Sequence, residues 1–95
     1  IVQGVGQVLG EEVIYGEDGQ LVTSSISNAG LMRAAKIPTM RMAVAQNPSG
    51  LPHHAKGLGE APTIGTPIAI VRSIEKAVKR RIRSTPVRQE DVTGL

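Results

Sequence analysis

The sequence has no cysteine, tryptophan or phenylalanine, and Tyr15 is its single aromatic residue. Without cysteine the chain has no disulfide, no thiolate metal ligand and no thiol chemistry. Without large aromatic rings the core has to be built from aliphatic side chains, each of which buries less area than Phe or Trp. A chain of 95 residues is one domain or part of one, and its core is modest.

Long apolar runs and targeting patterns are also absent. The longest apolar run, Pro67 to Val71, is far too short to cross a bilayer, and no signal-peptide pattern opens the chain. The first residue is Ile1 rather than Met, and it lies inside a helical pattern. We therefore interpret the 95 residues as a piece of a longer protein.

The net charge of +3 is uneven, because eight of the eleven Lys and Arg residues fall between positions 51 and 95. Four of them cluster at Lys79, Arg80, Arg81 and Arg83. One interpretation is that they close a helix, where cations complement the helix dipole. The other is a nucleic-acid patch, but no stacking aromatic residues and no helix-turn-helix or zinc-finger spacing accompany it. We favour the first interpretation.

Two helices and several strands are expected from the apolar periodicity. Residues 1–13 show helical spacing that is interrupted by Gly4, Gly6 and Gly10, and such a helix packs closely against another backbone or a ligand. A hairpin is predicted for residues 13–23, with its turn at Gly16–Gly19. Further strands are predicted at Met40–Ala45 and at Ile82–Val87, separated by turn-forming residues.

The strongest helix is predicted from about Pro67 to Arg81, with Thr66 as the N-cap and Pro67 in the first turn. Glu75 and Lys79 are spaced for a favourable ion pair. A last helical turn is expected at residues 89–92. The predicted class is α+β: antiparallel strands with a glycine-rich N-terminal helix and this long amphipathic helix on one face. The apolar positions that define its buried face are Ile70, Val71, Ile74, Ala77 and Val78.

One carboxylate stands out in the stretch from Ala55 to Ile70. Glu60 follows the turn Lys56–Gly59, in which Gly57 and Gly59 permit close approach of a cofactor or a positive φ. Next to Leu58 and Ile64, this carboxylate would be desolvated and would serve as a proton acceptor. The alternative is a plain helix-entry carboxylate at the positive end of the following helix.

Other candidate groups favour no chemistry. The adjacent side chains of His53 and His54 point apart and have no third ligand at metal-site spacing, so no metal site is predicted. Gly57 and Gly59 belong to neither a Walker nor a dinucleotide fingerprint. Glu11 and Glu12 are interpreted as a surface pair rather than an acid/base dyad.

Four segments, in this order, resemble the C-terminal end of the molybdenum-binding subunit of the xanthine dehydrogenase and aldehyde oxidase family. They are QGVGQVLGEEVIYGEDGQLVT (3–23), RAAKIP (33–38), AKGLGEAPTIGTP (55–67) and RSTPVRQEDV (83–92). The third, which we call the signature loop, is the most specific. The resemblance implies that all of residues 1–95 are the C-terminal portion of a molybdenum-cofactor-binding domain.

The resemblance also implies roles for individual residues. Glu60 falls on the family's catalytic glutamate, the general base of an oxidative hydroxylation at the molybdenum centre. Gln3 matches the glutamine whose side-chain amide touches molybdopterin, and Gly4 and Gly59 are the further cofactor-binding candidates. Lys56 matches the basic residue of the signature loop, with an orienting or structural role. The chain departs from the family before this loop, at residues 28–32 and 50–54, where the substrate funnel is affected.

The partners implied by the resemblance lie outside this chain. They are the remainder of the molybdopterin subunit, iron–sulfur clusters and FAD on other domains or subunits, and a small-molecule substrate, in a cytoplasmic enzyme. No nucleic acid or membrane is expected, and a homo-oligomer is compatible with the pattern. We expect no cofactor on the isolated chain and no activity from it. The alternative is a non-catalytic, truncated or degenerate module that docks with partner subunits.

Overall fold

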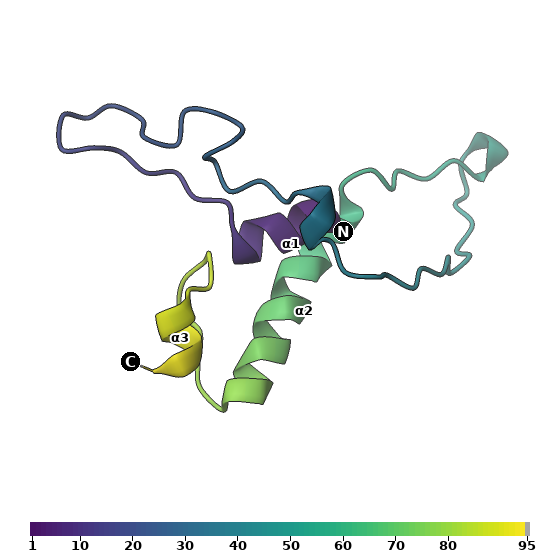
Figure 1. Cartoon of the computed structure of the whole chain (residues 1–95). Coiled ribbons are helices and arrows are strands. Elements are labelled where there is room, and N and C mark those ends of the chain that lie inside the picture. Colours follow the sequence, from purple (N-terminus) through teal and green to yellow (C-terminus); the bar gives the residue numbers. More distant parts are fainter. Residues whose placement is uncertain (95) are drawn as a thin grey trace.

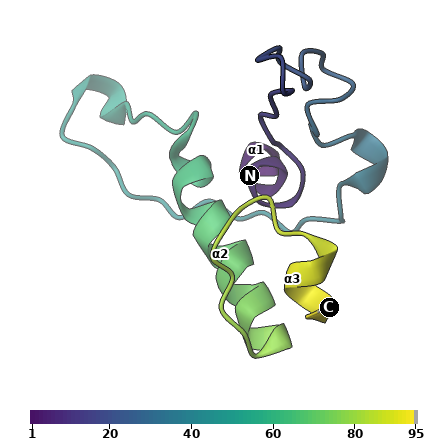
Figure 2. The ribbon, with the colours of Figure 1, turned by 90° about the vertical axis from the view of Figure 1, so that its left-hand side faces the viewer.

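The computed structural model describes residues 1–94. Three α-helices, α1 (Val2–Leu9), α2 (Ala61–Val78) and α3 (Gln89–Thr93), are joined by long irregular segments that contain two short 3-10 turns, η1 (Ala34–Lys36) and η2 (Pro52–His54). α1 packs against α2, and α3 lies beside the C-terminal half of α2 (Figures 1 and 2). Two long loops project from this helical centre in different directions (Figure 1). None of the helices in residues 1–94 is long and apolar enough to cross a membrane.

The contact between α1 and α2 depends on glycine. Gly4, Gly6 and Val8 are the buried residues of α1, and Val8 is the one fully buried apolar side chain among the described residues. A Cβ atom on Gly4 would lie 2.8 Å from the Cβ atom of Thr66 in α2. The sequence offered a backbone or a ligand as the neighbour of this glycine-rich helix, and for Gly4 the neighbour is α2.

α2 begins earlier and ends earlier than the predicted range of residues 67–81. It starts at Ala61 with Pro62 in its first turn, so Pro67 lies inside the helix. Both prolines fit the rule that places proline near a helix start, and the upstream one is used. The helix ends where Lys79 takes a left-handed conformation (φ 56°, ψ 33°).

The face of α2 that the periodicity predicted to be buried is only half-buried, and Ala77 on it is exposed. The predicted Glu75–Lys79 pair is not formed. Instead, the Glu75 carboxylate accepts a hydrogen bond from Arg72 Nη1 at 2.8 Å and another from the backbone N–H of Ile82 at 3.0 Å. These bonds fasten the chain just after the helix end, where the cationic cluster lies.

The α+β prediction is wrong, because residues 1–94 contain no strand. The predicted hairpin is reduced to a chain reversal with a single antiparallel bridge between Tyr15 and Leu21. Residues 40–45 and 82–87 are extended or irregular and form no ladder. A two-stranded ribbon is marginal in water unless further strands or a packed face support it. The described residues offer neither to these segments.

The C-terminal segment returns to α1. The backbone N–H of Val87 donates to the Val8 carbonyl oxygen at 2.7 Å, and the Arg88 guanidinium pairs with the Glu12 carboxylate. The predicted last helical turn is present as α3, and Arg80 Nη2 donates to the Val92 carbonyl at 2.8 Å. α1 is therefore held by α2 and by residues 87–88.

The molecule is much more open than a packed domain of its length. Its radius of gyration is 17.0 Å, whereas a compact domain of this length has about 12 Å. Its accessible surface is 7934 Å², against about 5,200 Å² for a folded monomer of this mass. The projecting loops account for this shape (Figure 2).

Candidate functional site

A network of hydrogen bonds fixes the loop that precedes the signature Glu60. Ser49 Oγ donates to the Ala55 carbonyl at 2.7 Å and accepts from the backbone N–H of Leu51 at 3.2 Å. Nδ1 of His54 lies 2.9 Å from the Ser49 carbonyl oxygen, and Lys56 Nζ donates to the Asn47 carbonyl at 3.0 Å. Ser49 is the centre of this network, which the sequence analysis did not single out. Lys56 links the two ends of this loop through Asn47, and the orienting or structural role that the resemblance implies for it stays a prediction.

The two glycines of the signature loop face open space. A Cβ atom on Gly57 or Gly59 would meet nothing within 4 Å, and neither residue is among those with positive φ in residues 1–94. Gly57 and Gly59 therefore do not adopt the left-handed conformation that the sequence analysis allowed for them. What the two glycines leave is unobstructed access to the backbone directly before Glu60.

Glu60 stands at the entry of α2, as its N-cap residue. Its carbonyl oxygen accepts the backbone N–H of Thr63 at 2.9 Å and the Thr63 hydroxyl at 2.6 Å, which fixes the main chain. Its side chain is exposed, and within residues 1–94 its carboxylate makes neither a hydrogen bond nor an ion pair. Leu58 and Ile64 are 68% and 74% exposed. The apolar surroundings predicted for Glu60 are not formed by the described residues.

Gln3 and Glu60 lie on two elements that touch each other. Gln3 is exposed in the first turn of α1, next to the buried Gly4. Gly4 lies against Thr66, which is in the second turn of α2. The helix contact thus brings the segment with the predicted cofactor amide to the N-terminal half of the helix that Glu60 opens. The hollows described next are lined by other residues, so these two side chains share none of them.

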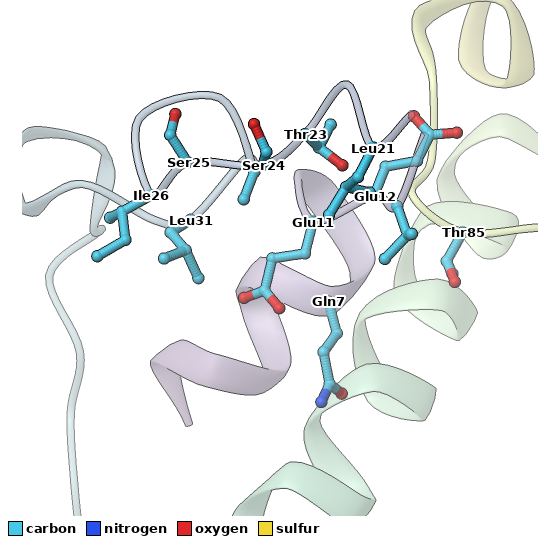
Figure 3. A pocket seen from close by; sticks show the side chains of 12 residues that line it. Gln7, Glu11, Glu12, Leu21, Thr23, Ser24, Ser25, Ile26, Leu31 and Thr85 are labelled. Carbon is cyan, nitrogen blue, oxygen red and sulfur yellow. The ribbon is translucent and has the colours of Figure 1, made fainter. Parts of the chain in front are cut away.

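An open hollow of about 650 Å³ lies between the end of α1 and the loop that follows it (Figure 3). Gln7 and Glu11 extend from the α1 side, and the apolar side chains of Leu21, Ile26 and Leu31 come from the loop (Figure 3). Glu11 was predicted to lie on the surface, and no sequence pattern indicated a hollow here. Glu11 is the single acid in it without a cation, since Glu12 pairs with Arg88. Its hydroxyl side chains, those of Thr23, Ser24, Ser25 and Thr85, make no hydrogen bond to a general base within residues 1–94, so the arrangement supplies neither an activated nucleophile nor an acid/base pair.

A smaller hollow of about 340 Å³ lies within the second loop, between residues 44–48 and 54–58. Val44 and Leu58 contribute its apolar lining, and Lys56 contributes a cation that already binds Asn47. His54 also lines it, but residues 1–94 contain no group of three metal-ligating side chains. The hollow therefore has no set of ligands for a metal ion of its own.

The charges at the C-terminal end of α2 are partly used in structural bonds. Arg72 pairs with Glu75, and Arg80 binds the backbone of α3. The backbone N–H of Ile82 and the Arg72 guanidinium hold the pKa of the Glu75 carboxyl below its ordinary value of 4.5. Within residues 1–94, Arg80 is the member of the cluster that fastens the helix end to the C-terminal segment.

Comparison with known proteins shows similarity to a subunit of a dehydrogenase complex. No known family profile matches it. It is similar to the gamma subunit of the 6-hydroxypseudooxynicotine dehydrogenase complex of Paenarthrobacter nicotinovorans, with 36% identity over 96 aligned residues. The alignment covers 96% of this chain but 12% of that subunit. The chain thus spans about an eighth of the length of its curated relative, which is one component of a dehydrogenase complex with several subunits.

Proposed function

We propose that the chain is the C-terminal part of the molybdopterin-binding subunit of a molybdenum hydroxylase. In this proposal Glu60 is the general base for oxidative hydroxylation of an aldehyde or N-heterocycle. The order of the four family-like segments supports it, and so does the similarity to a dehydrogenase-complex subunit. The observation that carries it is the place of Glu60 in the signature loop, directly after Gly59 and on a main chain that the first turn of α2 fixes.

The main chain around Glu60 suits a base that has to reach an external group. Its carbonyl oxygen is held by Thr63, so the Cα position is set by the first turn of α2. Its carboxylate has no competing cation among the described residues, so both oxygens are free to accept a proton. A general base has to come within hydrogen-bond distance of the proton that it removes. Because the Glu60 side chain is exposed, it would be able to contact a group that the rest of the subunit holds next to it.

The residues present fit a bound pterin cofactor at two of the three predicted positions. The Gln3 side chain is exposed on α1, and the space at Gly59 is open. The space at Gly4 is instead taken by Thr66. Gln3 would hold the cofactor through its amide, Gly59 would admit it close to the backbone, and Gly4 would hold α1 against α2. The cofactor, when bound, would supply the two-electron oxidation of the substrate.

The remaining components of such an enzyme would lie outside this chain. We place most cofactor contacts on the rest of the same subunit, and iron–sulfur clusters and FAD on other domains or subunits. The substrate remains open among purines, aldehydes, N-heterocycles and acyl-CoA compounds. The isolated chain would not turn over any of them, and turnover by the 95 residues alone would contradict this part of the proposal.

The substitution Glu60→Gln in the complete protein tests the proposal. It keeps the size of the side chain and removes its ability to accept a proton, so turnover should fall by about 10²–10⁴-fold. Metal and pterin content should stay at the wild-type level. Glu90→Gln, which removes another exposed carboxylate from a short helix, is the matched control and should leave turnover unchanged. Turnover of Glu60→Gln near the wild-type level would overturn the assignment.

The second candidate is a non-catalytic module that docks with partner subunits. The outward position of Glu60, away from the hollows described above, is the observation that favours it. Reading the DNA upstream of the codon for Ile1 distinguishes the two. An open frame that continues into a long molybdopterin subunit supports the enzyme, and a start codon with its own ribosome site supports the module.

A further inference from the structure

A hollow at the C-terminal end of α2 is lined mainly by cationic side chains. Between positions 72 and 83 the sequence has six Lys or Arg residues and a single acid, Glu75. Lys79, which follows the last helical residue, has a left-handed conformation (φ 56°) that turns the chain away from the helix axis. Residues on both sides of this turn line one hollow of about 400 Å³, namely Arg72, Glu75, Lys76, Lys79, Arg80 and Arg81.

Structural bonds use only part of this charge. Arg72 forms an ion pair with Glu75, and Arg80 binds the backbone of α3. The other cations of the hollow are exposed, and their side chains make no hydrogen bond and no ion pair within residues 1–94. We call these three residues the basic patch, and they are Lys76, Lys79 and Arg81.

The helix dipole does not account for the whole basic patch. Cations are favoured at the C-terminal end of a helix, and the effect falls off within the last turn. It therefore covers Lys76 and Lys79, whereas Arg81 comes three positions after the last helical residue, Val78. Like charges three positions apart on a helix also repel each other. The patch is thus suited to an anionic group from outside residues 1–94.

The basic patch lies far from the proposed base. α2 has 18 residues and is therefore about 27 Å long, with Glu60 at one end and the patch at the other. A single small substrate or cofactor at Glu60 does not reach across that length. The C-terminal end of α2 also lies away from both projecting loops (Figure 1). The patch therefore suits a partner that contacts a different surface of the molecule.

The composition and position of the patch favour a separate protein chain as that partner. Surfaces that bind single-stranded nucleic acid combine cations with stacking aromatic rings, and Tyr15, the one aromatic residue, does not line the hollow. Charged patches mainly raise the rate at which two molecules meet and select among partners. A segment of the same chain is already tethered and gains little from such steering, whereas a separate subunit gains much. The sign of the charge requires carboxylates on the surface of that subunit.

We propose that the basic patch docks an acidic surface of another subunit of the enzyme complex. This rests on the proposed function, in which further subunits join the one that contains this chain. Asp or Glu side chains of the partner enter the hollow, where the Arg81 guanidinium binds a carboxylate through two parallel hydrogen bonds. Lys76 and Lys79 add positive charge that steers the encounter.

The association rate of the complete subunit with the other subunits of the complex tests the proposal. Lys79→Gln combined with Arg81→Gln should lower the rate constant about 10-fold at low ionic strength, and added salt should reduce the difference. The matched control is Lys36→Gln combined with Arg41→Gln, which removes the same two charges from exposed residues outside the patch. The control should associate near the wild-type rate. Equal rates for the two double variants would overturn the proposal.

Zero-length cross-linking of the assembled wild-type complex is a second test, and it needs no substitution. A carbodiimide joins a lysine amine to a carboxylate only where the two groups touch. Lys76 or Lys79 should therefore be joined to an Asp or Glu of another subunit. Cross-links only to acids of the same subunit would overturn the proposal in favour of a contact within one chain. The absence of cross-links from both lysines would also overturn it.

Nucleic acid is the competing class of partner. Fluorescence anisotropy of a labelled single-stranded oligonucleotide with the complete subunit tests it, and no binding at the patch is expected. Oligonucleotide binding that is lost in Lys79→Gln with Arg81→Gln, while the subunits of this variant associate at the wild-type rate, would overturn the proposal in favour of nucleic acid.

These outcomes are separable from the test of Glu60. Slow association of the patch variant together with an active Glu60→Gln enzyme would retain the docking surface and reject the base. Association of the patch variant at the wild-type rate together with an inactive Glu60→Gln enzyme would do the reverse.

Discussion

Gly4 in α1 lies so close to Thr66 in α2 that a Cβ atom on the glycine would stand 2.8 Å from the threonine Cβ. Pro67 closes the same space from one side, with its Cδ atom 3.1 Å away. The contact joins the helix that carries Gln3 to the helix that follows Glu60. The absence of a side chain at one position thus sets the arrangement of the two segments that the proposed site needs.

We expect Gly4→Ala to destabilise the protein. Alanine improves intrinsic helix propensity by up to about 1 kcal/mol, but the added methyl group overpacks the helix contact at a typical cost of about 1–3 kcal/mol. Thermal unfolding followed by circular dichroism should show a lower midpoint. The matched control is Gly65→Ala in α2, where an added Cβ meets nothing within 4 Å, and its midpoint should stay or rise. A raised midpoint for Gly4→Ala would contradict the close contact.

The backbone at Gly10 lies directly against the backbone at Gly30. This contact can be tested by comparing alanine variants of Gly30 and Gly19. Gly30 has φ +77° and an added Cβ would run into the Gly10 carbonyl oxygen, whereas Gly19 has the same φ and open space. Gly19→Ala should cost about 1–2 kcal/mol for the left-handed conformation. Gly30→Ala should cost clearly more, because the clash is added to the same strain. Equal free energies of unfolding for the two variants would show that these backbones do not cross.

The hydrogen bonds of Glu75 should make the stability of the protein fall in acid. Hydrogen bonds from the backbone of Ile82 and from Arg72 lower its pKa below the ordinary value of 4.5. The stability that this carboxylate contributes is therefore complete well above pH 4.5 and is lost as the pH falls through the lowered folded pKa. The difference in unfolding free energy between the wild type and Glu75→Gln should be constant near neutral pH and shrink in acid. A difference that grows in acid would contradict the bonding.

α2 carries a second apolar stripe that nothing covers in residues 1–94. Ile64 and Ile68 are 74% and 64% exposed and lie one turn apart. The isolated chain should self-associate through this stripe, because exposed contiguous apolar surface promotes association. Replacing both residues by serine should shift the sedimentation coefficient towards the monomer. Serine at Ala69 and Ala77, which are exposed on the same helix, is the control and should have little effect.

The sequence predicted those features of the fold that are decided locally. The Asp18–Gly19 reversal forms, with Gly19 at φ +77° and the N–H of Gln20 bonded to Asp18 Oδ1 at 3.0 Å. The half-buried face of α2 follows from its apolar period. The start of α2 was wrong because Thr66–Pro67 and Pro62 both satisfy the local rule for a helix start, and the rule does not choose between them.

The strands were predicted wrongly for a different reason. Alternation at residues 40–45 indicates a preference for pairing, but a strand exists only with a partner, and residues 1–94 provide none. The environment of Glu60 likewise depends on residues that are far from it in the sequence or outside residues 1–94. Glu60 as a helix-entry carboxylate was only the alternative interpretation, because the helix was predicted to start at Pro67 and starts at Ala61. The predicted desolvation of Glu60 needs neighbours that the described residues do not include. The burial of Gly4 against Thr66, rather than against a cofactor, depends on tertiary packing that no local pattern encodes.

The most direct test of the central claim is a single-turnover measurement on the complete enzyme. Substrate is mixed rapidly with the oxidised wild type or with Glu60→Gln, and the rate of reduction of the bound cofactors is followed by absorbance. If Glu60 removes the proton, the variant binds its cofactors normally and is reduced about 10²–10⁴-fold more slowly. Reduction of the variant at the wild-type rate would contradict the account.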